Sequence, residues 1–269
     1  MSLQVIVNAD DFGLDEATNA VILRAFQHGM ISSATAMANM PALRNACALA
    51  RQQPMLRGRI GLHFNLSHGR PLSEAILHEP LFCNPAGEFE FTLSRKCLWL
   101  GRRTRQAIEQ ELAAQWQHCL GLGLLPSHLD SHQHIHNVWP IGEIVARFAA
   151  REGVPVRLAR NIGSNIGMAK RVFKSLLNRR LKQLAGAAAD HVCTPVDLRD
   201  GWLPRSGVLE VVVHPSALGN ADFGDAYLPA GESLLDLLDD RLSGVTRVGY
   251  GILTASLAGR QRLKATRSV

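Results

Sequence analysis

Apolar strand-like runs alternate with helical runs along most of the sequence, and no other feature constrains the fold as strongly. Strands separated by helices form parallel sheets, and a chain of this length suits a closed or nearly closed barrel. We therefore predict an α/β fold, a single-domain, TIM-barrel-like (β/α) barrel with about seven to eight parallel strands. The predicted strands are 4–9, 33–38, 59–66, 127–130, 155–158, 191–193, 209–214 and 247–253, and the predicted helices are 16–28, 42–51, 105–120, 138–151, a basic segment around 168–184, and 233–242.

Composition supports one large domain with a buried core. The chain has 269 residues, of which 46% are hydrophobic and 19% charged, so we expect a single domain over residues 1–269, with a basic tail from about residue 259. Its five cysteines are scattered and form no C-x-x-C pair, which argues against a disulfide framework and favours a reducing compartment. No leader-like segment and no membrane-length apolar run is present, so we expect a soluble, cytoplasmic protein.

The net charge of +6 is concentrated in one segment, where eight basic residues lie between positions 157 and 182. Apolar residues recur there at helical spacing, which predicts an amphipathic basic helix. Such a helix is typical of the outside of a barrel, and it also suits weak contact with a phospholipid surface or a pyrophosphate-linked sugar. Nucleic acid is not an expected partner, since the segment has one aromatic residue and no recognised motif. The apolar positions are Met168, Val172, Leu176 and Leu184, widened by Phe173, Leu177 and Leu181.

Polar side chains arrive at the carboxyl ends of several predicted strands. Asp10 and Asp11 end the first strand, His63 lies late in the third, His214 ends a later one, and four histidines fall within 128–136. Barrels of this class place their chemistry at that end, so convergence predicts a functional site there. Each residue has a plainer interpretation: a helix cap for either aspartate, a core position for His63 or His214, and a solvated loop for the histidine run.

The adjacent carboxylates of Asp10 and Asp11 suit two different tasks. They cannot both face inward from a regular strand, because side chains alternate, so we expect a turn at Gly13 to separate them. One would bind a cation and the other would act as a base. The triplet from Asp11 to Gly13 also matches the metal motif of protein kinases, but the glycine-rich loop, strand lysine and catalytic-loop signature of that class are missing.

Four blocks of sequence resemble the YdjC/ChbG-type carbohydrate deacetylases, in the order and spacing of that family. The resemblance covers most of the chain, and the combination is far more specific than any single motif. The blocks are NADDFGL at 8–14, GLHFNL at 61–66 with GRPL at 69–72, PSHLDSHQHIH at 126–136, and EVVVHP at 210–215.

The resemblance implies a distorted (β/α) barrel that removes the acetyl group from an N-acetylated amino sugar with the help of one divalent metal ion. Asp11, His63 and His132 match the family's metal ligands. Asp10 matches the general base that deprotonates the attacking water, and His214 the general acid that protonates the departing amine. Zinc suits one carboxylate and two imidazoles best, and magnesium is the alternative.

The histidine segment leaves the ligand choice open. In the wider group of polysaccharide deacetylases both histidine ligands come from one H-x-x-x-H segment, so His128 competes with His63, and equally with His132, for a place at the metal. The remaining polar residues are expected to orient the ligands or to contact substrate, with a barrel-rim position as the alternative for the arginine. They are His128, Asp130, His134, His136 and Arg157.

One position departs from the family pattern, and several functions stay open. Gly231 stands four residues after Tyr227, where the family pattern has an arginine, which affects how the site closes over a sugar. A metal-dependent phosphoesterase or glycosidase could use the same ligands, and a carbohydrate-binding relic would have lost catalysis. The sugar itself, an oligosaccharide or a lipid-linked glycan, is not fixed by the sequence. A homodimer is a further expectation.

Overall fold

The structure is a computed structural model that describes residues 2–163, 166–219 and 222–254. The basic tail predicted from about residue 259 lies outside this part. The strands are β1 Leu3–Phe12, β2 Ser33–Ala36, β3 Ile60–Phe64, β4 Leu129–Ser131, β5 His191–Cys193, β6 Gly207–Val213, β7 Pro215–Leu218, β8 Asp222–Asp225 and β9 Thr246–Arg247. The helices are α1 Glu16–Gln27, α2 Leu43–Gln52, α3 Glu74–Leu77, α4 Arg102–Gly121, α5 Trp139–Glu152, α6 Met168–Ala185, α7 Pro195–Arg199 and α8 Leu234–Arg241, with 3-10 turns η1 Pro54–Leu56 and η2 His132–Asn137.

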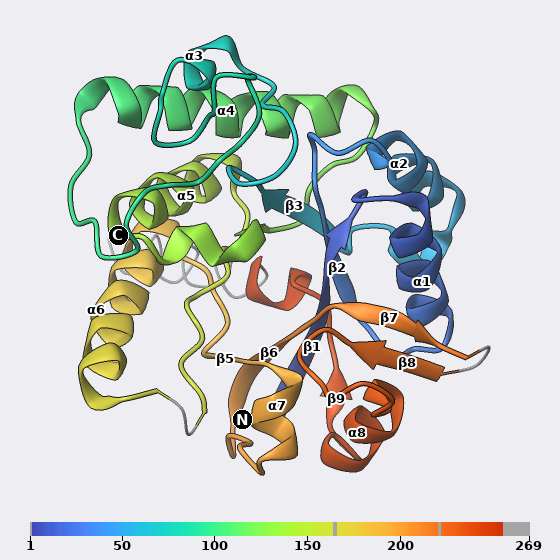
Figure 1. Cartoon of the computed structure of the whole chain (residues 1–269). Coiled ribbons are helices and arrows are strands. Elements are labelled where there is room, and N and C mark those ends of the chain that lie inside the picture. Colours follow the sequence, from blue (N-terminus) through green and yellow to red (C-terminus); the bar gives the residue numbers. More distant parts are fainter. Residues whose placement is uncertain (1, 164–165, 220–221, 255–269) are drawn as a thin grey trace, which may run out of the picture.

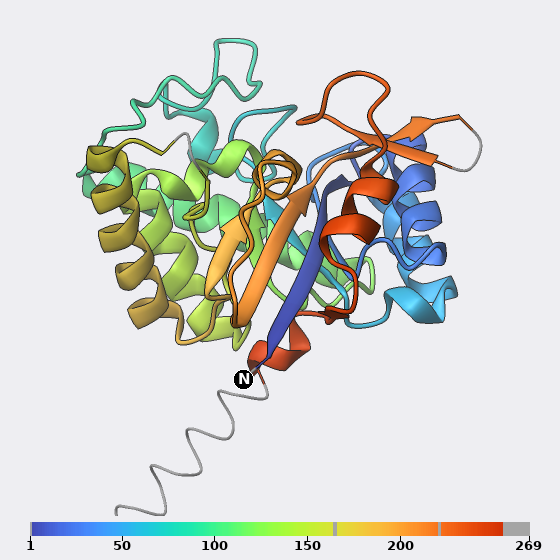
Figure 2. The same ribbon diagram turned by 90° about the horizontal axis from the view of Figure 1, so that it is seen from below.

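A curled parallel sheet forms a half-barrel at the centre of the molecule, in the order β4-β3-β2-β1-β6-β5, with β9 also paired to β1. The helices cover the outside of the curled sheet, α1 and α2 on one flank and α5 and α6 on the other (Figures 1 and 2). The predicted α/β class and parallel pairing are confirmed. Strand β1 is central because its residues are apolar on both faces, as in Val5, Ile6 and Val7, which are fully buried.

The predicted strand at 155–158 is wrong. Val156 forms only an isolated bridge with Leu129 of β4. On its other side Val156 donates to Ala187, and Asn161 then donates to Val192 of β5, so the hydrogen bonds skip residues and build no ladder. This stretch crosses the gap between β4 and β5, where a closed barrel would need a full strand.

The predicted strand at 247–253 is also wrong, since β9 ends at Arg247 and residues 251–254 are helical. Gly249 and Gly251 flank Tyr250 and weaken an extended conformation. Tyr250 turns inward instead, fully buried, and stacks on the ring of His128. Several short elements were not predicted, among them the antiparallel pair β7–β8 and the helices α3 and α7.

Helix α6 is present as predicted, and it buries only part of its wide apolar stripe. Met168, Val172 and Leu176 are 77%, 54% and 54% exposed, whereas Leu177 and Leu181 are fully buried. The helix carries two apolar rows, and the row through Leu177 and Leu181 packs against α5, where Leu181 lies beside Gly142. The row through Met168 lies on the surface. Within the described residues, every helix is too short or too polar to cross a membrane.

Candidate active site

A bulge at the carboxyl end of β1 brings two adjacent carboxylates into one site. The pairing of β1 with β2 is regular up to Ala9 and resumes at Phe12, and Asp11 in between has φ +69°. The extra residue cancels the alternation of a strand, so Asp10 and Asp11 both face inward. The sequence placed this turn at Gly13. Gly13 does have φ +90°, but the irregularity begins two residues earlier.

Asp11, His63 and His132 meet at this point, from β1, β3 and the start of η2. Asp11 Oδ1 lies 2.8 Å from His132 Nδ1 and 3.3 Å from His63 Nε2, and the two imidazole rings are edge to face at 5.4 Å. One donor atom from each of the three residues falls within 4.8 Å of the others. This is a group of one carboxylate and two imidazoles, which suits zinc or another divalent ion.

Asp130 orients the ring of His63. Asp130 Oδ1 lies 2.7 Å from His63 Nδ1, and Thr35 Oγ1 donates to Asp130 Oδ2 at 3.0 Å. A carboxylate only accepts hydrogen bonds, so Nδ1 carries the proton. The lone pair of Nε2 is then free to bind a cation. Among the described residues His63 Nε2 is buried without a hydrogen-bond partner. An orphaned buried nitrogen aimed at Asp11 fits a metal ligand.

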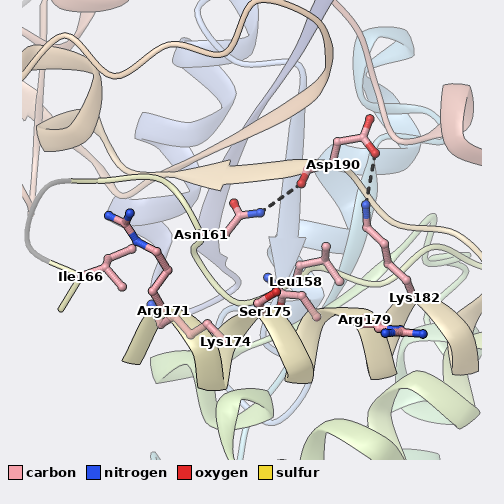
Figure 3. A pocket seen from close by; sticks show the side chains of 10 residues that line it. Leu158, Asn161, Ile166, Arg171, Lys174, Ser175, Arg179, Lys182 and Asp190 are labelled. Atoms are coloured by element: carbon pink, nitrogen blue, oxygen red, sulfur yellow. Dashed lines mark hydrogen bonds and ion pairs between the residues drawn. The ribbon is translucent and has the colours of Figure 1, made fainter. Parts of the chain in front are cut away.

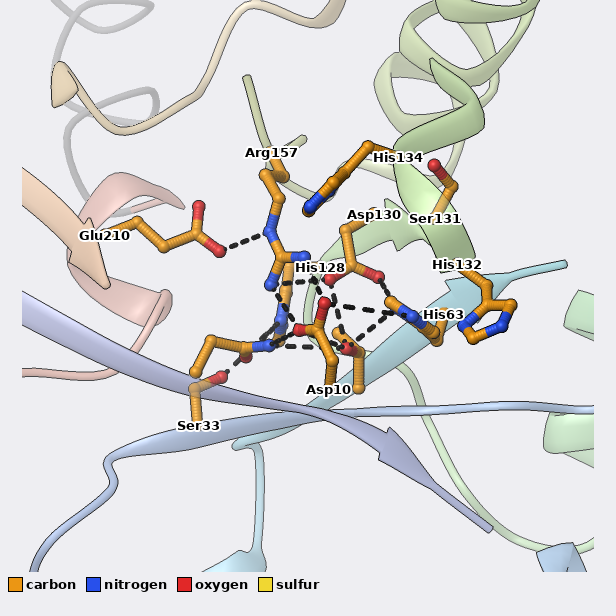
Figure 4. A network of polar contacts seen from close by, with 12 residues as sticks. Asp10, Ser33, His63, His128, Asp130, Ser131, His132, His134, Arg157 and Glu210 are labelled. Atoms are coloured by element: carbon orange, nitrogen blue, oxygen red, sulfur yellow. Dashed lines mark hydrogen bonds and ion pairs between the residues drawn. The ribbon is translucent and has the colours of Figure 1, made fainter. Parts of the chain in front are cut away.

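Arg157 lies beneath the carboxylates and is fully buried. It donates to both oxygens of Asp10 at 2.7 Å, while its Nη2 lies 2.7 Å from Asp130 Oδ2 and its Nε donates to Glu210 (Figure 4). Burial alone would raise the pKa of Asp10, but Arg157 and His63 outweigh it and hold that pKa well below its usual range. Burial raises the pKa of Glu210 even beside Arg157.

The charge balance of the site also fits a cation. Four carboxyl groups gather here, those of Asp10, Asp11, Asp130 and Glu210, and within the described part of the chain Arg157 is the one arginine or lysine paired with any of them, contacting all but Asp11. A second donor group, Asp10 with His63 and Asp130, is also compact enough to hold an ion. The oxygens of Asp10 and Asp130 in that group already accept from Arg157, so the group around Asp11 suits an ion better.

His214 borders the same space from the end of β6. Its Nε2 lies 3.8 Å from Asp10 Oδ2 and 4.0 Å from Asp11 Oδ2. The backbone N–H of His214 donates to Asp225, and the ring of Tyr227 stands edge to face against the imidazole at 4.9 Å. Asp10 and His214 thus present side-chain atoms to the group around Asp11 from two different strands.

His128 lies apart from that group. It is fully buried, its Nε2 is 3.1 Å from Asn8 Oδ1, its Nδ1 is 2.9 Å from Ser127 Oγ, and its ring stacks on Tyr250 at 3.6 Å. Burial, assisted by Arg157, holds the pKa of His128 well below its usual range, so the ring is uncharged. His128 and His132 were alternative predicted metal ligands, and the structure brings His132 to Asp11.

His134 and His136 make their hydrogen bonds away from the imidazoles of that group. His134 has φ +52°, and its Nε2 lies 3.3 Å from the Tyr227 hydroxyl. Burial, with Arg157 nearby, lowers the pKa of His134 to about 3. His136 is buried and pairs with the hydroxyl of Ser131. Both residues were expected to orient the ligand imidazoles or to contact substrate. Of these candidates, Asp130 is the one that hydrogen-bonds to a ligand imidazole, that of His63.

The sequence indicated no role for Thr35 or Glu210, which both belong to the network: Thr35 donates to Asp10 and Asp130, and Glu210 accepts from Arg157 at its edge (Figure 4). Thr35 Oγ1 also lies 3.1 Å from His63 Nδ1. A signal was present for the glutamate: Glu210 and Arg157 are lone charges within apolar strand-like runs, and a buried charge needs an opposite partner. Thr35 sits in a run of small residues and gave no comparable signal.

Comparison with known proteins agrees with the blocks found in the sequence. The model of the family described as YdjC-like protein matches residues 4–231. The chain belongs to the YdjC-like family. A chitooligosaccharide deacetylase of Klebsiella pneumoniae (strain 342) is 33% identical over 244 residues, 88% of this chain and 91% of the relative. A carbohydrate deacetylase of Geobacillus stearothermophilus is 44% identical over 158 residues, 58% of this chain and 59% of the relative.

A solved structure has the same fold as this YdjC-like chain. An Enterococcus faecalis V583 protein, provisionally named a cellobiose-phosphate cleavage protein, superposes with a TM-score of 0.69 and 20% identity, over 94% of this chain and 99% of that one.

The glycine at position 231, where the family pattern has an arginine, is consistent with the local backbone. Gly231 has φ +85°, a conformation that an arginine side chain would make strained.

Proposed function

We propose that this YdjC-like protein is a metal-dependent carbohydrate N-deacetylase, which hydrolyses the acetamide of an N-acetylated amino sugar in an oligosaccharide or a lipid-linked glycan. The observation that carries the proposal is the meeting of Asp11, His63 and His132, with His63 Nε2 free of any hydrogen bond in the described chain and Asp10 and His214 alongside. The names of the two relatives point to the same activity.

In this proposal Asp11, His63 and His132 hold one divalent ion, with zinc favoured and magnesium as the alternative. When bound, such an ion supplies Lewis acidity, which makes a water molecule acidic at neutral pH and stabilises negative charge on the acetyl oxygen. Asp130 keeps the His63 ring in the tautomer that presents Nε2, as hydrogen-bonded carboxylates do at many metal sites.

Asp10 acts as the general base. Arg157 grips both its oxygens, which fixes the carboxylate and keeps it ionised at neutral pH. A carboxylate with a low pKa is a weak base, so this role requires a water that is already acidified. Oδ2, the oxygen nearer to His214, accepts the proton as the water oxygen adds to the acetyl carbon.

His214 acts as the general acid. Its Nε2 lies 3.8 Å from Asp10 Oδ2. His214 can therefore deliver a proton to the amine close to the place where Asp10 takes up the proton of the water. The C–N bond breaks as the amine nitrogen accepts that proton, and the products are acetate and a sugar amine. Tyr227 holds the ring edge to face at the outer side of the site.

Other chemistry fits the geometry less well. A glycosidase needs two carboxylates that face each other across the scissile bond, whereas Asp10 and Asp11 are neighbours on one bulge.

We further propose that the chain is one domain and that its fold is a distorted barrel whose open seam lies between β4 and β5. The cytoplasmic location and the homodimer stay predictions.

The test is acetate release from a panel of N-acetylated mono-, oligo- and lipid-linked sugars, before and after treatment with a chelator. Asp11→Asn and His63→Gln should lose both bound metal and acetate release. His78→Gln, at an exposed histidine that ends α3, is the matched control and should keep both. Release of phosphate, or shortening of the glycan without acetate, would overturn the proposal in favour of a phosphoesterase or a glycosidase.

A further inference from the structure

A basic cavity of about 340 Å³ lies on the outer side of the sheet, between α6 and a facing part of the chain that contributes Leu158, Asn161 and Ile166 (Figure 3). Four cationic side chains and one carboxylate line it, together with polar groups such as Asn161. The charged residues are Arg171, Lys174, Arg179, Lys182 and Asp190. The positive charges therefore outnumber the negative ones within a space large enough for a small anion.

The single carboxylate is already in use. Asp190 Oδ1 lies 3.1 Å from Lys182 Nζ, and Asp190 also accepts from the backbone of Val208. Among the residues described, Arg171, Lys174 and Arg179 have no carboxylate within 4.0 Å. Lys174 Nζ donates to the backbone oxygen of Arg160 at 2.8 Å.

The surroundings of Lys174 disfavour the charged form of its amine. Burial, followed by the charges of Arg160 and Lys170, lowers the pKa of Lys174 to about 8. An anion in the cavity would reverse this effect, because it favours the charged form of the amine. The cavity thus gains most from a ligand that brings negative charge and several acceptor oxygens.

The cavity is separate from the candidate active site. Arg157 points inward to Asp10, whereas the next residue, Leu158, lines the cavity on the opposite side of the same segment. A ligand in the cavity would not occupy the space around Asp11.

An exposed apolar row runs beside the cavity on α6. Met168, Val172 and Leu176 follow one another at intervals of four, and all three are more than half exposed. Arg171 and Arg179 belong to the neighbouring row of the same helix, since residues three apart are adjacent on a helix surface. A phosphate held by the cavity would therefore sit next to an apolar surface, which suits a phospholipid head group with its chains along that row.

We propose that the cavity between α6 and the residues Leu158, Asn161 and Ile166 binds a phosphate group, and that the apolar row beside it directs this site to the head group of an anionic phospholipid. Free phosphate offers the same oxygens without the apolar part. The two sources are therefore separated by experiment.

The test uses the full chain in two arms, calorimetry with inorganic phosphate and co-sedimentation with vesicles of phosphatidylcholine, either pure or mixed with phosphatidylglycerol. Lys174→Met and Arg171→Met should each weaken binding roughly tenfold or more, because each removes a charged hydrogen-bond donor. Arg147→Met, an exposed arginine on α5, is the matched control and should bind like the wild type. Thermal melting of each variant verifies that it is folded.

A double variant, Val172→Ser with Leu176→Ser, separates the two sources. It should weaken binding to the mixed vesicles and leave phosphate binding unchanged if the ligand is a head group. Binding of phosphate alone, abolished by Lys174→Met, would support the cavity with free phosphate as its source. The proposal is overturned if neither phosphate nor mixed vesicles bind, or if the cavity variants bind like the wild type. No readout here requires deacetylase activity, so the outcome is independent of the proposed function.

Discussion

Arg157 forms ion pairs with three buried carboxyl groups, so its removal is a sharp test of the network. The fully buried guanidinium contacts Asp10, Asp130 and Glu210, each at hydrogen-bond distance. Arg157→Met would leave three buried carboxyl groups without their cation. Removing one partner of a buried ion pair costs about 3–5 kcal/mol, which is a large part of the stability of a folded chain.

The expected effects are measurable in two assays. At roughly 2–4 °C per kcal/mol for a chain of about this size, thermal melting should fall by about 6–20 °C. Turnover should fall more than KM changes, because Asp10, the proposed base, loses the group that fixes it.

A second substitution tests the electrostatic reason directly. Glu210→Gln in the Arg157→Met background removes one of the stranded carboxyl groups, so the double variant should be more stable than Arg157→Met alone. A melting temperature of Arg157→Met close to that of the wild type would refute the reasoning. So would a double variant that is less stable than Arg157→Met.

Three further predictions follow from individual contacts. His128→Gln should keep its bound metal, whereas His132→Gln should lose it, as measured by metal content after purification; the reverse result would exchange their roles. Gly61→Ala should destabilise the chain by about 1–3 kcal/mol in denaturant unfolding, since the added Cβ would lie 2.6 Å from His128 Nδ1 and 2.7 Å from the His128 backbone oxygen. The pKa of His134 falls from 6.5 to about 3 on burial, so between these pH values the unfolded chain binds a proton that the folded chain does not, and stability decreases as the pH drops through this window. His134→Gln should show a shallower decrease, and an unchanged pH dependence would contradict the assignment.

The sequence predicted those parts of the fold that depend on local pattern. The long apolar runs at β1, β3 and β6 could be recognised because strands buried on both faces are continuously apolar. The segments 155–158 and 247–253 misled because they are apolar too, and only tertiary hydrogen bonding decides that one bridges a gap and the other turns at Gly249. The helix α6 has two apolar rows, and the sequence does not say which one packs against α5.

For the candidate site, the sequence predicted which strand-end residues come together, but it did not predict which side chains contact one another. Parallel strands bring their carboxyl ends together, so Asp10, Asp11, His63 and His214 were expected to meet, and their atoms do lie within about 4 Å of a neighbour in the group. The choice between His128 and His132 depends on the end of β4, where a difference of a few residues moves a ring from the packed interior to the site. The contacts of Arg157 span much of the chain, and no local pattern encodes them.

The most direct measurement of the central claim is acetate release from an N-acetylated chitooligosaccharide, with bound metal determined on the same samples. The account predicts that the metal-loaded wild type releases acetate, that chelation abolishes release and reloading restores it, and that Asp10→Asn keeps its metal while turnover falls about 10²–10⁴-fold. Acetate release that survives complete removal of metal, or near-normal turnover by Asp10→Asn, would contradict it.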